Sequence, residues 1–441
     1  MTTNSLWDTT ALLTDRYELT MLQSTLRDGT AHRPSVFELF ARRLPEGRRY
    51  GVVAGIGRAL DALADFTFDK TALDYLRSAE VVDEDTIEWL ASYRFTGSIS
   101  GYPEGEVFFP GSPVLIVEGT FAECVILETL FLSILNHDSA IASAASRMIT
   151  AAGGRPCIEM GSRRTHEAAA VASARAAYIA GFAATSNLQA GDSYGIPTTG
   201  TSAHSFTLLH DTERAAFEAQ IDALGKGTTL LVDTYDVAEA VRTAVELAGP
   251  ELGAVRLDSG DLVSLAATVR KQLDELGATG TRITVTSDLD EYAIATLASA
   301  PVDGYGVGTA LVTGSGFPTC GFVYKLVARE GGDGTMVPVA KKSKDKISVG
   351  GRKYVLRQKA RGRAQAEVIG IGEPPANDGD DRAILVPLVR EGKRVYNESL
   401  DDARTRLRAS LAELPASATR LSKGEPVIET VYADLSQVGL M

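Results

Sequence analysis

One arrangement recurs through the middle of the chain and constrains the fold more than any other feature. A short apolar run ends in turn or charged residues and is followed by a helical segment, and this order occurs eight times. The runs cover residues 156–160, 183–187, 196–199, 229–233, 254–257, 282–286, 303–307 and 321–327. Strands that alternate with helices predict parallel pairing, and polar groups at the strand ends are typical of an α/β barrel, whose active site is assembled there from separate loops.

The chain is longer than one barrel needs. It has 441 residues, and an α/β barrel takes about 250. We therefore expect an irregular α/β barrel at 121–327, an N-terminal α+β domain at 1–120, and a C-terminal segment at 328–441 that partly joins the N-terminal part in a second, smaller α+β domain. Glycines, prolines and β-formers alternate over 95–119, which predicts antiparallel strands outside the barrel. The lysine-rich stretch 341–346 predicts a solvated hairpin tip.

Composition narrows the class of protein. The net charge of -13 argues against a broad nucleic-acid surface. We find no apolar run of the roughly 18 residues that a membrane span needs, and no signal peptide, so we expect a cytoplasmic protein without nucleic-acid or membrane partners. The cysteines Cys124, Cys157 and Cys320 are odd in number and lack paired spacing. They are therefore expected to be buried free thiols rather than disulfides or metal ligands.

His204 lies among small hydroxyl residues in the stretch Gly200-Thr-Ser-Ala-His-Ser-Phe206. Small neighbours leave room for a phosphate-sized group. Two interpretations are open: a loop histidine bonded to nearby carbonyls, or one wall of a shared pocket. The position of His204 at the end of a predicted barrel strand favours the pocket.

Two adjacent arginines, Arg163 and Arg164, follow the run at 156–160 and precede a helix. Cations at a helix N-terminus oppose the helix dipole, so local stability does not explain them. Guanidinium groups bind phosphate or carboxylate oxygens in a bidentate manner. We therefore interpret the pair as an anion-binding element.

The stretch Arg256-Leu-Asp-Ser-Gly-Asp261 combines a cation with two carboxylates at another strand end. It is either an ion pair that caps the next helix, or a site in which Arg256 binds an anionic substrate while Asp258 accepts from ribose hydroxyls. In the second case Asp258 and Asp261 are possible neighbours of Mg²⁺. The run at 303–307 ends in Gly306, Val307, Gly308 and Thr309, which suits a backbone nest for a phosphate.

Tyr17 stands in the first turn of a predicted helix that Asp15 begins. It is either a partly buried aromatic residue or a flat ring offered to a ligand. The chain has no Walker A sequence and no His-Glu-x-x-His zinc motif.

Six blocks together resemble the nicotinate phosphoribosyltransferase family, in the same order and over residues 10 to 360. The blocks are Leu13-Thr-Asp-Arg-Tyr-Glu-Leu-Thr-Met21, Glu159-Met-Gly-Ser-Arg-Arg164, Thr185-Ser-Asn187, Gly200-Thr-Ser-Ala-His-Ser-Phe206, Val255-Arg-Leu-Asp-Ser-Gly-Asp261 and Gly306-Val-Gly-Thr309. The resemblance implies a dimeric type II phosphoribosyltransferase of NAD salvage. Such an enzyme joins nicotinate to 5-phosphoribosyl 1-diphosphate with Mg²⁺, and ATP hydrolysis is coupled to the step, as in the ATP-dependent ligases.

The resemblance also implies roles for particular residues. His204 is similar to the histidine that ATP phosphorylates, and Tyr17 to the aromatic residue that reaches from the neighbouring subunit to stack on the pyridine ring. The predicted contacts to nicotinate and the sugar phosphate are Arg163, Arg164, Asn187, Thr201, Arg256, Ser287, Asp288, Gly306, Gly308 and Thr309, with Gly308 and Thr309 at the 5-phosphate.

Asn187 bears on which pyridine is the substrate. The nicotinamide enzyme related to this family has an aspartate at the matching position, and a carboxylate there would repel nicotinate, so Asn187 favours the acid. The alternatives are a nicotinamide phosphoribosyltransferase and a non-catalytic sensor of phosphoribosyl metabolites. A barrel hydrolase or aldolase is disfavoured, because the only lysine in a predicted barrel run is Lys325 and no motif around it suggests a Schiff base.

Overall fold

The computed structural model describes residues 8–341 and 349–433. The chain divides into two compact units, one made of Met1–Ala140 with Thr319–Met441 and the other of Ile141–Pro318. The unit built from the two chain ends is the larger one, not the smaller domain that we expected. Residues 342–346 of the lysine-rich stretch lie outside the described residues.

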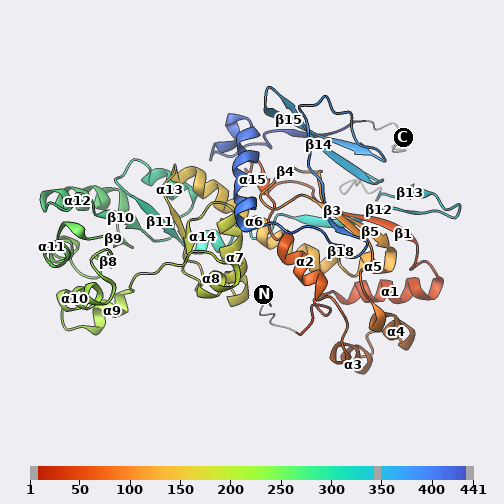
Figure 1. Ribbon diagram of the computed structural model, residues 1–441, viewed down its shortest axis with the longest axis horizontal. Helices are drawn as coiled ribbons and strands as arrows, with labels where there is room; N and C mark the ends of the chain where they lie inside the picture. Colours follow the sequence, from red (N-terminus) through yellow and green to blue (C-terminus); the bar gives the residue numbers. More distant parts are fainter. Residues whose placement is uncertain (1–7, 342–348, 434–441) are drawn as a thin grey trace. The chain divides into compact units, whose positions relative to one another are not determined.

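A six-stranded parallel sheet forms the framework of the second unit, as the repeated strand–helix pattern predicted (Figure 1). The strand order is β7-β6-β11-β10-β9-β8, and the curled sheet makes half of a barrel. The strands are β6 (Cys157–Glu159), β7 (Ala184–Thr185), β8 (Thr229–Leu231), β9 (Ala254–Leu257), β10 (Arg282–Val285) and β11 (Gly304–Val307). Parallel pairing places all their carboxyl ends at one edge.

Two of the eight predicted barrel runs do not become strands of this sheet. The run 196–199 forms a single bridge between Thr185 and Thr198, because Pro197 has no N–H to donate to a ladder. The run 321–327 becomes β12 (Phe322–Glu330), which pairs antiparallel with β1 (Pro34–Ala41) in the first unit. Apolar periodicity alone does not distinguish these pairings. The predicted barrel boundaries of 121 and 327 are therefore replaced by 141 and 318.

Helices alternate with these strands along the chain, except that three helices stand between β7 and β8. In this unit the helices after β6 are α7 (Glu167–Ile179), α8 (Leu188–Tyr194), α9 (His204–Leu209), α10 (Glu213–Leu224), α11 (Val237–Ala248), α12 (Leu262–Glu275), α13 (Glu291–Leu297) and α14 (Thr309–Val312), with the 3-10 turn η1 (Gly249–Glu251). The carboxylates of Asp236, Asp261 and Asp290 cap α11, α12 and α13 directly after β8, β9 and β10. Each cap satisfies backbone N–H groups and so fixes where a strand-end loop becomes a helix.

The first unit contains a seven-stranded sheet of order β13-β12-β1-β5-β3-β17-β18, a four-stranded sheet of order β16-β14-β15-β19, and the pair β2-β4. Its remaining strands are β2 (Gly51–Val52), β3 (Ser98–Gly101), β4 (Val107–Phe108), β5 (Pro113–Thr120), β13 (Met336–Pro338), β14 (Lys353–Ala360), β15 (Arg363–Ile371), β16 (Arg382–Ala383), β17 (Val386–Arg390), β18 (Lys393–Arg394) and β19 (Glu429–Tyr432). Its helices are α1 (Arg16–Asp28), α2 (Ile56–Ala64), α3 (Lys70–Ser78), α4 (Glu84–Ser92), α5 (Phe121–Val125), α15 (Leu400–Glu413) and η2 (Ala416–Thr419). The antiparallel strands predicted within 95–119 are β3, β4 and β5.

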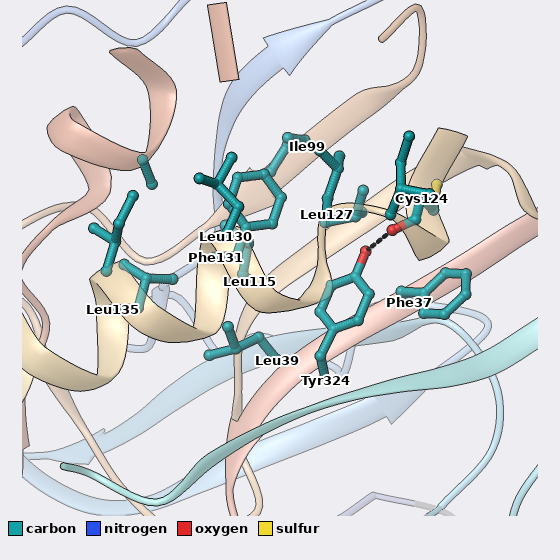
Figure 2. Packing of buried hydrophobic residues seen from close by; sticks show 14 of the residues in the cluster. Phe37, Leu39, Ile99, Leu115, Cys124, Leu127, Leu130, Phe131, Leu135 and Tyr324 are labelled. Atoms are coloured by element: carbon teal, nitrogen blue, oxygen red, sulfur yellow. Dashed lines mark hydrogen bonds between the residues drawn. The ribbon is translucent and has the colours of Figure 1, made fainter. Parts of the chain in front are cut away.

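The core of this unit packs β1, β5 and β12 against apolar side chains that follow α5 (Figure 2). The rings of Phe37 and Tyr324 stack with centroids 4.9 Å apart, and the Tyr324 hydroxyl donates to the Cys124 carbonyl at 3.0 Å. All three cysteines are buried and free, as predicted. Burial raises the pKa of the Cys157 thiol to about 12.

The apolar segment from Phe121 continues through α5 into the unbroken helix α6 (Glu128–Ala152). By length and composition Phe121–Ala152 qualifies as a membrane span, but 61% of its most apolar window is buried within the protein. It also carries the fully buried Asp138, whose carboxylate accepts from Arg58 at 2.8 Å. A buried, paired charge of this kind is what a core helix of a globular unit can accommodate.

A second set of buried charges joins β14 and β15 to β4. The fully buried Arg357 donates to Glu106 at 2.7 Å and also to Glu367, and Arg382 donates to Glu106 at 2.6 Å. Burial by itself would raise the pKa of Glu106, but the two arginines hold it below its usual value. These contacts tie strands that are distant in sequence.

Replacing one member of this cluster should destabilise the first unit. Arg357→Leu leaves the buried Glu367 without its guanidinium partner, and breaking a buried pair in this way costs about 3–5 kcal/mol. Trp89 belongs to this unit, so tryptophan fluorescence during urea unfolding reports the loss as a lower midpoint. The control is Arg390→Leu at an exposed position of β17, and equal midpoints for the two variants would contradict the cluster's role.

Candidate active site

The polar residues predicted from the strand ends lie along one edge of the parallel sheet. The strands that these residues follow lie side by side in the order β7, β6, β11, β10, β9, β8. Because adjacent parallel strands are about 5 Å apart, side chains from consecutive ends can meet. The contacts below show which of them do.

His204 is the first residue of α9 and contacts two strand ends. Its Nδ1 lies 3.0 Å from Thr234 Oγ1, which follows β8, and its Nε2 lies 3.9 Å from Asp258 Oδ2, which follows β9. The His204 side chain is 41% exposed. One ring nitrogen is thus held by the protein while the imidazole stays open to solvent and faces a carboxylate.

Arg256 extends from β9 toward the same group. Its guanidinium donates to Thr201 Oγ1, three residues before His204. Burial lowers the Arg256 pKa and the nearby Arg163 lowers it further, whereas Asp258 and Asp233 raise it. The Nε of Arg256 is buried and has no hydrogen-bond partner within the described part of the chain. A half-buried cation close to a second cation is an arrangement suited to a bound anion.

Asp233 and Thr234, which follow β8, also belong to this cluster. No role was predicted for either of them from the sequence. Asp233 Oδ2 accepts from the Asp258 backbone N–H and from Ser259 Oγ, both at 2.8 Å. Its Oδ1 is buried without a partner among the described residues. Asp233 therefore fixes the turn that carries Asp258, while Thr234 holds His204. Their position at the end of the run 229–233 was the signal that could have identified them.

Glu159 organises the neighbouring loops at β6 and β7. It is fully buried, and it accepts from the Gly161 backbone N–H and from Thr185 Oγ1. Burial raises the Glu159 pKa. Its carboxylate links the loop that leads to Arg163 with the loop that leads to Asn187.

Asn187 uses both ends of its amide for structure. Its Oδ1 caps α8 by accepting from the Ala190 backbone N–H at 2.9 Å, and its Nδ2 donates to Ser162 Oγ at 3.0 Å. Arg163 and Arg164 follow Ser162 and are exposed. The amide of Asn187 is therefore tied to the loop that carries the arginine pair.

Backbone conformation constrains the loop after β10, whereas close packing constrains the end of β11. Ser287 has a φ of 148°, which is strained for a residue with a side chain, and Asp288 beside it is exposed. A Cβ at Gly306 would lie 2.5 Å from Thr286 Cγ2, so packing requires glycine there. A Cβ at Gly308 would meet its nearest neighbour at 3.4 Å, an ordinary contact. Thr309 is exposed.

Two predicted site residues, Asp261 and Tyr17, make contacts outside the cluster around His204 and Arg256. Asp261 caps α12 by accepting from the Ser264 backbone N–H at 3.4 Å, and it also accepts from Ser264 Oγ at 2.7 Å, which lowers the Asp261 pKa. Tyr17 belongs to the first unit, where it is 45% exposed; burial and the nearby Glu128 raise its pKa to about 12. Among the described residues, no group of three or more His, Cys, Asp or Glu side chains could hold a metal ion.

Comparison with known proteins gives one consistent family. Residues 12–136 match the model of the nicotinate phosphoribosyltransferase (NAPRTase) N-terminal domain. A nicotinate phosphoribosyltransferase of Mycobacterium tuberculosis is 59% identical over 96% of this chain and 95% of its own length, and one of Bacillus subtilis is 39% identical over 84% and 78%. The crystal structure of human nicotinic acid phosphoribosyltransferase superposes with a TM-score of 0.82 at 26% identity, covering 96% of this chain and 98% of the human one.

The cluster around Arg256 should bind multivalent anions. Arg256→Gln removes a charge-assisted donor, and such bonds contribute about 1.5–3 kcal/mol, so the dissociation constant for inorganic diphosphate should rise about tenfold to a hundredfold in titration calorimetry. The control is Arg242→Gln on α11, whose guanidinium pairs with Glu239 on its own helix. Equal dissociation constants for the two variants would remove Arg256 from the anion site.

Proposed function

The chain belongs to the nicotinate phosphoribosyltransferase family, and we propose that it makes nicotinate mononucleotide and diphosphate from nicotinate and 5-phosphoribosyl 1-diphosphate in NAD salvage. The proposal includes coupling to ATP hydrolysis through a phosphohistidine at His204, and a cytoplasmic homodimer. The single observation that carries it is the cluster in which Arg256, with Arg163 nearby, lies beside the His204–Asp258 pair.

The transfer step needs placement of charge more than a protein nucleophile. The pyridine nitrogen bonds to the anomeric carbon of the ribose while the carbon–oxygen bond to diphosphate breaks, and diphosphate leaves with the electron pair. The transition state resembles an oxocarbenium ion, so positioning and electrostatics carry most of the catalysis. Arg256 supplies a cation for the sugar phosphate, Asp258 can accept from ribose hydroxyls, and Gly308 with Thr309 offers backbone N–H groups to the 5-phosphate.

His204 suits the coupling step because an imidazole can be phosphorylated and dephosphorylated near neutral pH. The γ-phosphoryl group of ATP moves to a ring nitrogen, ADP leaves, and water later releases phosphate. Thr234 orients the ring through its contact with Nδ1. The Asp258 carboxylate lies 3.9 Å from Nε2, the ring nitrogen that Thr234 does not contact.

Mg²⁺ is bound in proteins by one or two carboxylates together with substrate phosphates. The edge offers such oxygens: the partly exposed carboxylate of Asp258, and the Oδ1 of Asp233, which has no hydrogen-bond partner among residues 8–341 and 349–433. When bound with the diphosphate, the ion would neutralise the charge that develops on the leaving group. Asp261 is less suited, because its carboxylate already caps α12.

The proposed homodimer gives Tyr17 its role. The Tyr17 ring is partly exposed in the first turn of α1 and lies near Glu128, which pairs with Lys325 at 3.6 Å. An exposed aromatic ring presents a flat face to a ligand. In the proposal this ring stacks on the pyridine bound by the partner subunit.

Removing the imidazole should abolish ATP coupling. We expect His204→Ala to release no ADP in response to nicotinate while retaining slow formation of nicotinate mononucleotide, with both products measured by chromatography. His210→Ala is the matched control, since His210 Nδ1 contacts the Phe206 carbonyl of the preceding helix at 2.8 Å and not a residue of the proposed site. Nicotinate-dependent ADP release by His204→Ala would refute the phosphohistidine.

The substrate is tested with nicotinate, nicotinamide and quinolinate, each with and without ATP. We expect turnover of nicotinate only; preference for nicotinamide would support that alternative enzyme, and no product from any pyridine would support a sensor. Asn187→Asp should lower kcat/KM for nicotinate about tenfold through charge repulsion while keeping the cap of α8, because Asp caps helices as well as Asn does. An unchanged ratio of nicotinate to nicotinamide turnover would contradict this role of Asn187.

A further inference from the structure

Three consecutive residues after α14 have left-handed backbone conformations. They are Gly314 with a φ of 63°, Ser315 with 52° and Gly316 with 83°. Glycine adopts this conformation readily, but a serine at the centre of such a run is disfavoured unless its surroundings hold it. Ser315 therefore needs a specific contact.

That contact is a buried carboxylate. Ser315 Oγ donates to Glu291 Oε2 at 2.7 Å, and the Ser315 backbone N–H donates to the Ala310 carbonyl at 2.6 Å. Glu291 is 2% exposed and uses its other oxygen, Oε1, to accept from Arg147 Nε at 3.0 Å. Arg147, on α6, is itself 6% exposed. The carboxylate is thus fixed from one side by a buried guanidinium and holds Ser315 on the other.

The bond joins two loops of the candidate site. Glu291 is the first residue of α13, directly after the loop that carries Ser287 and Asp288. Ser315 follows the short helix α14, which begins directly after Gly308. Because α14 is only one turn long, its two ends cannot move independently.

From this geometry we infer that Glu291, through Ser315, is a positioning residue for the loop that binds the 5-phosphate. The inference rests on the proposed function, because that function assigns the phosphate to Gly308 and Thr309. A bond to an ionised group is stronger than one between neutral groups. It therefore keeps the loop in its binding conformation before substrate arrives, which lowers the cost of binding.

Two substitutions separate the bond from the backbone strain. Ser315→Ala removes the hydroxyl and keeps a side chain in the left-handed conformation, whereas Ser315→Gly removes the hydroxyl but relieves the strain. The matched control is Ser299→Ala, whose hydroxyl is exposed and donates only to a carbonyl of its own helix turn at 3.2 Å. The measurements are KM for 5-phosphoribosyl 1-diphosphate, KM for nicotinate, and kcat.

We expect Ser315→Ala to raise KM for the sugar phosphate about tenfold, as loss of a hydrogen bond to a charged group would, with little change in kcat or in KM for nicotinate. Ser315→Gly should show a smaller rise, and Ser299→Ala none. A purely structural role would instead lower the amount of active protein and reduce kcat without this selective change in KM. That result, or an unchanged KM in Ser315→Ala, would overturn the inference.

Different results would refute the proposed function and the positioning role of Glu291. If the wild-type protein makes no nicotinate mononucleotide, the proposed function fails and the inference that rests on it fails too. If the wild type is active and Ser315→Ala has the wild-type KM for the sugar phosphate, the positioning role alone is refuted. Should Ser315→Ala not fold, Ser315→Gly provides the same comparison without the backbone strain.

Discussion

Parallel pairing in the second unit is the constraint on which the rest of the structure depends. It brings the carboxyl ends of six strands to one edge, so that residues far apart in sequence become neighbours. The polar groups of these loops must then form hydrogen bonds with one another. Carboxylates meet that need: the buried Glu159 joins the loops after β6 and β7, the half-buried Asp233 fixes the turn after β9, and the buried Glu291 joins the loops after β10 and β11.

The positive charges at this edge explain how an acidic chain can bind an anionic substrate. The net charge of -13 belongs to the whole sequence. At this edge, however, Arg163 lies close enough to Arg256 for its positive charge to lower the Arg256 pKa. Partial burial of Arg256 strengthens its interaction with a bound anion, because less water screens it. The neighbouring carboxylates of Asp233 and Asp258 compensate this positive charge and provide oxygens for sugar hydroxyls or Mg²⁺.

Much of this arrangement could be predicted from the sequence, and the exceptions have physical causes. Polar residues after apolar runs indicated the ends of six strands, with Arg256 and Asp258 at one of them, whereas His204 follows the run 196–199, which forms only an isolated bridge. Apolar periodicity did not reveal that 321–327 pairs antiparallel with β1, because strand direction depends on partners distant in sequence. Asp233 and Thr234 could have been identified from their position at the end of the run 229–233, but the contacts that define their roles are seen only in the fold.

The central claim is that these strand ends form one site for a sugar phosphate. A crystal structure with 5-phosphoribosyl 1-diphosphate and Mg²⁺ tests it most directly. The account predicts that the Arg256 guanidinium lies within about 3 Å of a substrate phosphate oxygen, with His204 lining the same pocket. A sugar phosphate bound away from this edge, with Arg256 contacting only protein atoms, would contradict it.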